Sequence, residues 1–177
     1  SAESKEVLET TKHETEKKEQ SSLGINAIRG VGETSESQES FPDNKYTDGK
    51  GRNLTMRTYP VGDSYYVRVF DKNKNPELPD QVSLGDAGLA NLHLERNEEG
   101  KVQKVKLQDI ITTPGYREAG TGSQMLEQCE AIAKQKGAGE IYGSFSAEEG
   151  KAEETRRFYE RRGYQFSDDG LNLSKEL

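Results

Sequence analysis

Apolar and polar residues alternate with a period of two through much of the middle of the chain. This pattern is typical of β-strands whose two faces lie in different surroundings. The alternating stretches are 53–59, 64–70, 86–96 and 101–113. The last two are joined by four polar residues that end in Gly100, as in a hairpin turn. The sequence therefore predicts four strands with an antiparallel start.

A helical period follows this strand region. Apolar side chains then recur at i, i+1, i+4, i+7 and i+8, which places them on one face of a helix. They are Met125, Leu126, Cys129, Ile132 and Ala133. Because Gly137 is a favourable C-terminal stop, we expect this helix to begin near Ser123 and to end near Lys136.

The rest of the chain continues to alternate between strand and helix. The pattern predicts a strand at 140–145, a helix at 151–162 and a short closing pair of strands at 164–167 and 171–174. The strand–helix–strand unit over 104–145 should be parallel and right-handed. The predicted fold class is α+β, a mixed central sheet with flanking helices in the order β-β-β-β-α-β-α-β.

The first part of the chain differs in composition from the remainder. Residues 1–45 are polar, rich in Glu, Lys, Ser and Thr, and show no sustained apolar period. Such a segment cannot bury enough apolar surface to offset the entropy cost of ordering. We therefore expect a disordered tail, followed by a folded domain at 46–177. The tail is either a docking arm for a partner or a solvated extension.

Composition limits the partners and the surroundings of the protein. The formal net charge of −7 argues against nucleic-acid binding and favours cationic partners. No stretch of the sequence is long and apolar enough to span a membrane, so no membrane partner is expected. The single cysteine, Cys129, cannot form an intramolecular disulfide, so a cytoplasmic location is expected. The sequence begins at Ser1 without methionine, which leaves open a targeting segment removed before it.

The stretch between the fourth strand and the first helix has the features of an anion site. Pro114 and Gly115 end the strand, and Gly120 and Gly122 directly precede the helical pattern. Amide groups in the first turn of a helix lack intrahelical partners, and glycine lets a phosphate approach the backbone. Two common nucleotide loops are absent, G-x-x-x-x-G-K-[ST] and G-x-G-x-x-G, the second of which fails at Met125.

Two motifs in this region resemble those of the GNAT superfamily of N-acetyltransferases. Residues 113–123 contain R-x-x-G-x-G and resemble that family's acetyl-CoA pyrophosphate loop. Residues 156–164 read R-R-F-Y-E-R-R-G-Y and resemble its late helix, which usually reads R-F-Y-E-x-x-G-F. The resemblance covers roughly the second half of the chain and implies a GNAT-like fold.

The resemblance implies that acetyl-CoA binds as the acetyl donor and that no metal takes part. The pyrophosphate would bind the loop backbone, and the pantetheine arm would lie where the strand at 110–112 diverges from the strand at 140–145. The implied cofactor-binding residues are Ile111, Thr112, Arg117, Glu118, Ala119, Gly120, Thr121, Gly122 and Ser123. Glu118 stands where the family commonly has glycine and brings a carboxylate near the phosphates.

The resemblance also implies acetyl transfer to a primary amine by direct attack in a ternary complex. Tyr159 matches the tyrosine that often protonates the CoA thiolate, and a phenol with a pKa of about 10 suits that role. The base is either Asp109 or His93, each acting through water, or there is no dedicated base. Tyr142 and Ser144 are candidates to line the channel.

The acceptor side of the chain departs from the family pattern. GNAT enzymes usually place one or two helices between their first two strands, whereas only residues 60–63 connect the predicted strands here. The acceptor, a small molecule or a protein, would meet an open site, or one formed by the loop at 71–85 or by the tail. A second interpretation is a non-catalytic domain that binds (acyl-)CoA or another protein. A third is a different phosphate ligand on an unrelated α+β fold.

Overall fold

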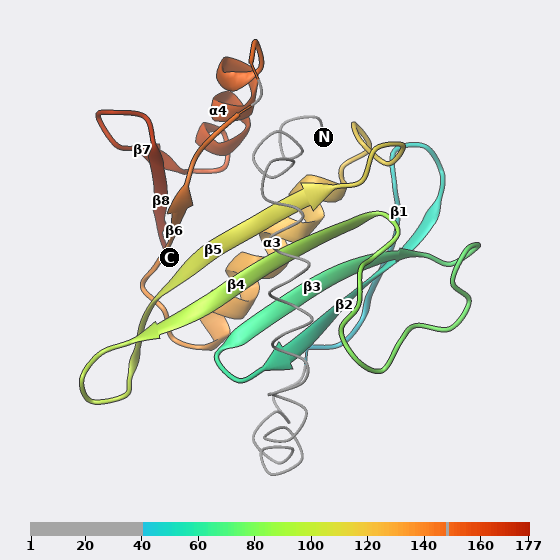
Figure 1. Ribbon diagram of the computed structural model, residues 1–177, viewed down its shortest axis with the longest axis horizontal. Helices are drawn as coiled ribbons and strands as arrows, with labels where there is room; N and C mark the ends of the chain where they lie inside the picture. The colour runs from blue at the N-terminus through green and yellow to red at the C-terminus, as the bar shows by residue number, and fades with distance from the viewer. Residues whose placement is uncertain (1–40, 148) are drawn as a thin grey trace.

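Figure 1 shows the computed structural model, which describes residues 41–147 and 149–177. The predicted tail lies outside the described residues, apart from 41–45. The strands and helices of the described chain are β1 (Asn44–Thr47), β2 (Asn53–Val61), β3 (Ser64–Asp71), β4 (Gly88–Arg96), β5 (Val102–Thr112), α3 (Thr121–Gln135), β6 (Glu140–Ser144), α4 (Ala152–Glu160), β7 (Gln165–Phe166) and β8 (Asn172–Glu176).

The strands form one mixed sheet in the order β1-β2-β3-β4-β5-β6-β8-β7. Neighbouring strands from β1 to β5 are antiparallel. β5 and β6 are parallel, and α3 connects them. The predicted α+β class, the antiparallel start and the parallel crossover are all confirmed.

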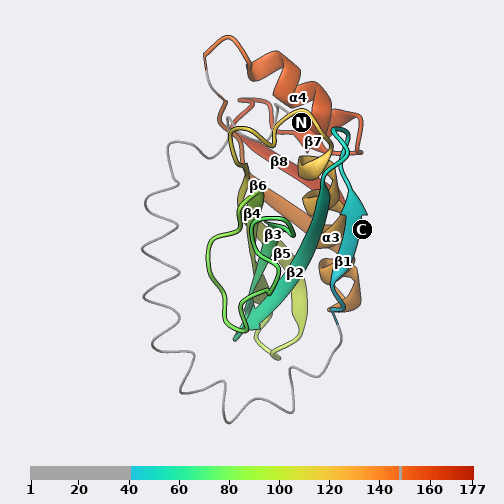
Figure 2. The same ribbon diagram turned by 90° about the vertical axis from the view of Figure 1, so that its right-hand side faces the viewer.

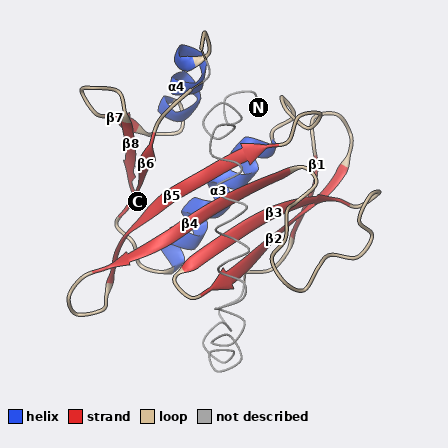
Figure 3. Ribbon diagram, in the orientation of Figure 1, coloured by secondary structure: helices blue, strands red, loops and turns tan. Residues whose placement is uncertain are grey.

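α3 packs on one face of the sheet, behind β4 and β5 in the view of Figure 3. All five apolar residues that predicted this helix are buried, and they join side chains of the sheet in the main core. Cys129 is one of them, and burial raises the pKa of its thiol well above the usual value. It is therefore a residue of the hydrophobic core.

The loop at 72–87, green in Figure 1, packs against the opposite face of β2 and β3. There Tyr59, Tyr66 and Phe70 form a smaller buried cluster with Val82 of the loop. The Tyr59 hydroxyl also donates to the carbonyl oxygen of Pro79 at 2.7 Å. The loop thus occupies a face that no helix covers in the described part of the chain.

β1 is a strand that the alternation of residues does not predict. It pairs with β2, and its half-buried Tyr46 donates to or accepts from the Thr121 hydroxyl at 2.9 Å. A four-residue edge strand with one aromatic side chain has too short a pattern to be recognised in a sequence. The fold therefore begins earlier than 53, where the first strand was predicted.

α4 lies at the end of the sheet formed by β6, β7 and β8, at the top of Figure 2. Glu130 of α3 contacts this part of the chain. Its carboxylate accepts from the hydroxyl of Tyr164, which follows α4, at 2.7 Å and from Nζ of Lys175 in β8 at 3.0 Å. These contacts hold the C-terminal part of the chain against the main body.

Candidate active site

The predicted phosphate loop connects the end of β5 to the start of α3. Gly120 caps the helix with a backbone φ of 94°, a value that glycine adopts without strain. The amide groups of the residues that follow open the helix and have no partner within it. Glu118 also has a positive φ, 60°, which is uncommon for a residue with a side chain. The loop thus has the backbone form of an anion site and carries one carboxylate.

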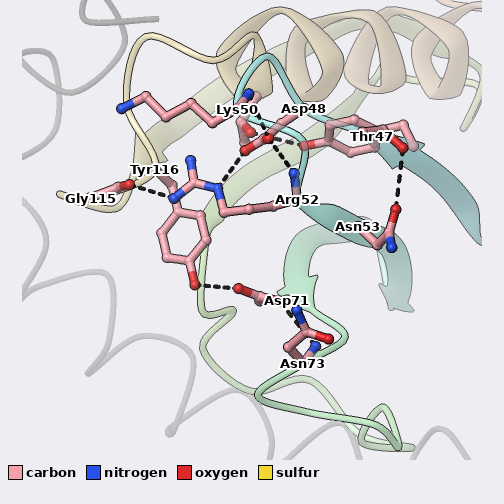
Figure 4. Close-up of polar contacts among 11 residues, drawn as sticks. Thr47, Asp48, Lys50, Arg52, Asn53, Asp71, Asn73, Gly115 and Tyr116 are labelled. Carbon is pink, nitrogen blue, oxygen red and sulfur yellow. Dashed lines mark hydrogen bonds and ion pairs between the residues drawn. The ribbon is translucent and has the colours of Figure 1, made fainter.

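The turn between β1 and β2 braces this loop, as Figure 4 shows. Arg52 Nη1 donates to the carbonyl oxygen of Gly115 at 2.7 Å, and the amide of Gly49 donates to the carbonyl oxygen of Ala119 at 2.9 Å. Arg52 is itself held by Asp48, whose carboxylate accepts from Arg52 Nε at 2.8 Å. One turn therefore contacts the loop near both of its ends.

Tyr116 connects the phosphate loop to the start of the loop at 72–87. Its buried hydroxyl donates to Asp71 Oδ2 at 2.7 Å, and Arg52 lies over its ring at 4.3 Å from the centroid (Figure 4). Burial, together with the bond to Asp71, raises the pKa of Tyr116. No pattern in the sequence points to Tyr116, because its role depends on contacts with two distant segments.

The residues implied for cofactor binding lie together around this loop. Ile111 and Thr112 are buried at the end of β5, and Arg117 Nε donates to the Thr112 carbonyl oxygen at 3.4 Å. At the helix start, the Ser123 hydroxyl accepts from Arg162, which follows α4. The other implied residues lie between them along the chain, namely Glu118, Ala119, Gly120, Thr121 and Gly122.

β5 and β6 separate between their last residue pair and this loop, and the separation leaves an opening in the sheet. They pair only at Val105–Ile141 and Lys106–Tyr142 in the described structure. Beyond these pairs lies a narrow cavity, which is lined by Leu107, Gln108, Asp109, Ile110, Gly143, Ser144, Tyr159 and Leu173. The structure thus brings the two predicted catalytic residues, Asp109 and Tyr159, to one opening.

A β-bulge determines which way Asp109 faces. Asn91 pairs with Asp109, yet the next residue of β4, Leu92, pairs with Leu107, so Gln108 is an extra residue in β5. Without this bulge, Asp109 would share a face with Leu107. With it, Asp109 lies beside Asn91, whose Nδ2 donates to Asp109 Oδ2 at 3.3 Å.

Tyr159 is 1% exposed and packs among aromatic rings. Its ring makes edge contacts with Phe145, Phe158 and Tyr164 at centroid distances of 6.3, 5.2 and 5.5 Å. These contacts fix the ring at the wall of the opening. Packing against Phe158 was the alternative to a catalytic role, and the structure shows both this packing and a place for Tyr159 in the cavity wall.

The other candidates from the sequence separate into those at the opening and those away from it. Ser144 lines the cavity, whereas His93 and Tyr142 are not among its lining residues. His93 Nδ1 lies 3.0 Å from the Ser64 hydroxyl on the neighbouring strand. Tyr142 donates to Glu95, and burial together with that carboxylate raises the pKa of Tyr142 to about 12.

A larger hollow of about 520 Å³ lies beside the helix start, between α3 and the residues that follow α4. It is lined by Ser123, Leu126, Glu127, Glu130, Arg161, Arg162 and Lys175. The neighbouring Arg156 and Arg157 instead form i,i+4 ion pairs on the exposed face of α4, with Glu160 and Glu153 respectively. The four arginines of residues 156–164 are thus divided between a solvated face and this hollow.

Residues 80–166 match the family model described as an acetyltransferase (GNAT) domain. Among solved structures, the chain is similar to the GNAT domain of S. lividans PAT, with 10% identity and a TM-score of 0.55 over 78% of this chain and all of that one. It is also similar to a GNAT family acetyltransferase from Elizabethkingia anophelis with acetyl-CoA bound, with 11% identity and a TM-score of 0.50 over 70% of this chain and 98% of that one. No curated protein sequence matches the chain significantly.

A third similar structure is the IAA acetyltransferase from Bacillus cereus ATCC 14579, with 11% identity and a TM-score of 0.50 over 70% of this chain and 99% of that one. At these identities the structures show the fold, and the family match adds the sequence relation. Residues 80–166 thus belong to the GNAT acetyltransferase domain family, which confirms both the resemblance and the GNAT-like fold expected from the two motifs.

Two further observations concern membranes and metals. Among the described residues, no helix has both the length and the apolar character needed to cross a bilayer. Within 41–147 and 149–177, His, Cys, Asp and Glu side chains do not gather in groups of three that could hold a metal ion.

Proposed function

We propose that this protein is an acetyl-CoA-dependent N-acetyltransferase that acetylates a primary amine by direct attack in a ternary complex. The observation that carries the proposal is the single opening between β5 and β6, which has the phosphate loop at one end and both Asp109 and Tyr159 in its wall. The similar Elizabethkingia anophelis structure, which holds acetyl-CoA, supports this ligand.

The donor would be held along the loop and the opening. The helix-start amides and Gly120 suit the pyrophosphate, because partial positive charge and close backbone approach favour an anion there. The adenosine end would lie in the hollow beside Ser123, where Arg161 and Arg162 supply positive charge. The edges of β5 and β6 beyond their last pair would flank the pantetheine arm.

The transfer step requires one proton acceptor and one proton donor. The neutral amine nitrogen forms a bond to the thioester carbonyl carbon, and the carbon–sulfur bond breaks. Asp109 would accept the proton that the amine loses, through water, because this residue of β5 lines the opening. Tyr159 would give its phenolic proton to the departing thiolate from the other side of the opening.

Two observations favour the alternative of a non-catalytic domain. Glu118 places a carboxylate in the phosphate loop, and residues 62–63 alone connect β2 and β3, with no helix there to shape an acceptor site. An NMR titration with acetyl-CoA and CoA distinguishes the cases. We expect shifts at the loop amides and at Ile111; no binding at millimolar ligand would contradict the proposal.

Turnover of an amine acceptor tests the catalytic part of the proposal. Once a screen of amines with acetyl-CoA gives a substrate, we expect Tyr159→Phe to lower kcat by about 100-fold or more while acetyl-CoA still binds. The ring and its aromatic contacts remain in this variant, so the loss reports on the hydroxyl. A kcat within about threefold of the wild-type value would exclude Tyr159 as the general acid.

A further inference from the structure

A buried cation lies in the sheet next to the opening. Arg68 of β3 is completely buried, and its guanidinium group is held on several sides. Its Nε donates to the carbonyl oxygen of Ser83 at 2.6 Å, and its Nη1 donates to the carbonyl oxygens of Val67 and Ala90 at 3.0 and 3.4 Å. Such a rigid and desolvated charge is costly, so its place in the core needs a reason beyond packing.

Asn91 connects this cation to the proposed base. Its Oδ1 accepts from Arg68 Nη1 at 3.0 Å, while its Nδ2 donates to Asp109 Oδ2 at 3.3 Å. Because one end of the amide accepts and the other donates, the Arg68 bond fixes which atom faces the carboxylate. The three side chains thus form a directed chain from β3 through β4 to β5.

The charges around Asp109 point to the same pairing. Burial lowers the pKa of Arg68 to about 9. The negative charge of Asp109 acts in the opposite direction and favours the charged form of Arg68. The other titratable group that lines the cavity is Tyr159 of α4, while β6 contributes Gly143 and Ser144 and β8 contributes Leu173. On β4, His93 lies on the same face and bonds to Ser64.

We propose that Arg68, acting through Asn91, is a positioning residue that orients the Asp109 carboxylate toward the opening and keeps it ionised. The inference rests on the proposed role of Asp109 as the base. An ionised carboxylate at this point would attract the protonated form of an amine acceptor and then accept its proton. A second effect follows from Ser83, because the loop at 72–87 holds Arg68 in place and so influences the base from a distance.

The experiment is a ¹³C NMR titration of the Asp109 carboxyl group in full-length wild-type protein and in variants. Arg68→Met removes the charge and keeps much of the apolar stem, so we expect the Asp109 titration midpoint to rise by about one pH unit or more. Arg57→Met is the matched control, since Arg57 donates to the carbonyl oxygen of Pro79 in the same loop but has its ion pair with Asp43. We expect Arg57→Met to leave the midpoint unchanged.

Asn91→Leu is the second variant and keeps the test decisive if Arg68→Met does not fold. It preserves side-chain size and the Arg68 charge but removes the bond to Asp109, so the midpoint should again rise. An unchanged midpoint in whichever of these variants folds would overturn the proposal. In kinetics, the acidic limb of the kcat/KM profile should move by the same amount while the KM for acetyl-CoA stays constant.

The outcomes separate this inference from the proposed function. If Asp109→Asn retains full activity but Arg68→Met still shifts the titration of Asp109, the pairing stands and the base assignment fails. If Asp109→Asn is inactive but no variant shifts the titration, Asp109 acts without help from Arg68. Activity of Asp109→Asn therefore tests the role of Asp109 as the base, and the titration of Asp109 tests its positioning by Arg68.

Discussion

At the scale of single residues, Glu118 is unfavourable at its position both in its backbone conformation and in its charge. Its φ of 60° is the left-handed conformation, which costs a residue with a side chain about 1 kcal/mol relative to glycine. Its carboxylate belongs to the loop that would receive the pyrophosphate. A feature that costs stability and repels the proposed ligand is an obvious place for a test.

We expect Glu118→Gly to bind acetyl-CoA about fivefold more tightly, because a repulsive charge near the phosphates is removed. Isothermal titration calorimetry at low and high salt measures the effect, which should be smaller at high salt. Glu118→Gln is the matched control, since it removes the charge and keeps the side chain in the left-handed conformation. Weaker binding by both variants would show that the carboxylate contributes to the site.

Single residues also show how far the sequence could lead. Tyr159 and Asp109 were predicted from a motif and a strand, and the structure brings both to one opening. Leu107 and Ile110 are both apolar although they lie three positions apart, and this break in the alternation was a sign of the bulge. Arg68 and Asn91 gave no signal, because polar residues within a strand normally lie on an exposed face.

At the scale of elements, the β1–β2 turn is a polar unit organised by Asp48. Burial opposes the charge of this carboxylate, yet hydrogen bonds from the amides of Lys50 and Arg52 and from Arg52 Nε hold its pKa below the usual value. The sequence did not reveal this unit, because its contacts with Gly115 and Ala119 join segments more than sixty residues apart.

Asp48 should stabilise the fold in a pH-dependent way. Since its pKa is lower in the folded state, its contribution is complete above the unfolded-state pKa of about 4 and is lost as the pH falls through the folded-state value. We expect Asp48→Asn to lower the free energy of unfolding by about 1–3 kcal/mol at neutral pH, and by less in acid. Urea denaturation of both proteins across this pH range measures the difference.

Asp63→Asn is the control for this measurement. Asp63 also pairs with an arginine, Arg96, but both side chains are about 40% exposed. An exposed ion pair contributes roughly 0–1 kcal/mol, so the change should be small at every pH. Equal losses of unfolding free energy in the two variants would mean that burial and the turn amides do not increase the contribution of Asp48 to stability.

At the scale of the whole molecule, the meeting of β5 and β6 determines both the fold and the site. Gly143 stands at the point where the strands separate, and a Cβ there would lie 2.7 Å from the carbonyl oxygen of Leu107. No side chain fits this contact without moving one strand. The general outline of strands and helices was predictable from periodicity, but such a close approach of two backbones was not.

We expect Gly143→Ala to destabilise the fold by about 1–3 kcal/mol, because the added methyl group forces the two backbones apart. Gly139→Ala is the control, since its Cβ would lie 3.9 Å from the nearest atom, the carbonyl oxygen of Gln103. Thermal unfolding of both variants measures the effect. Similar melting temperatures for the two variants would show that the strands can adjust at this point.

The short pairing of β5 with β6 also bears on how long the protein would last in a cell. Two residue pairs between β5 and β6 join the first five strands of the sheet to the last three. Glu130 of α3 adds contacts with Tyr164 and Lys175. A ligand lying in the opening would bridge both strands and so favour the folded state by mass action. Proteases act on opened molecules, and we therefore expect the abundance of this protein to follow the supply of acetyl-CoA, falling when the donor is scarce.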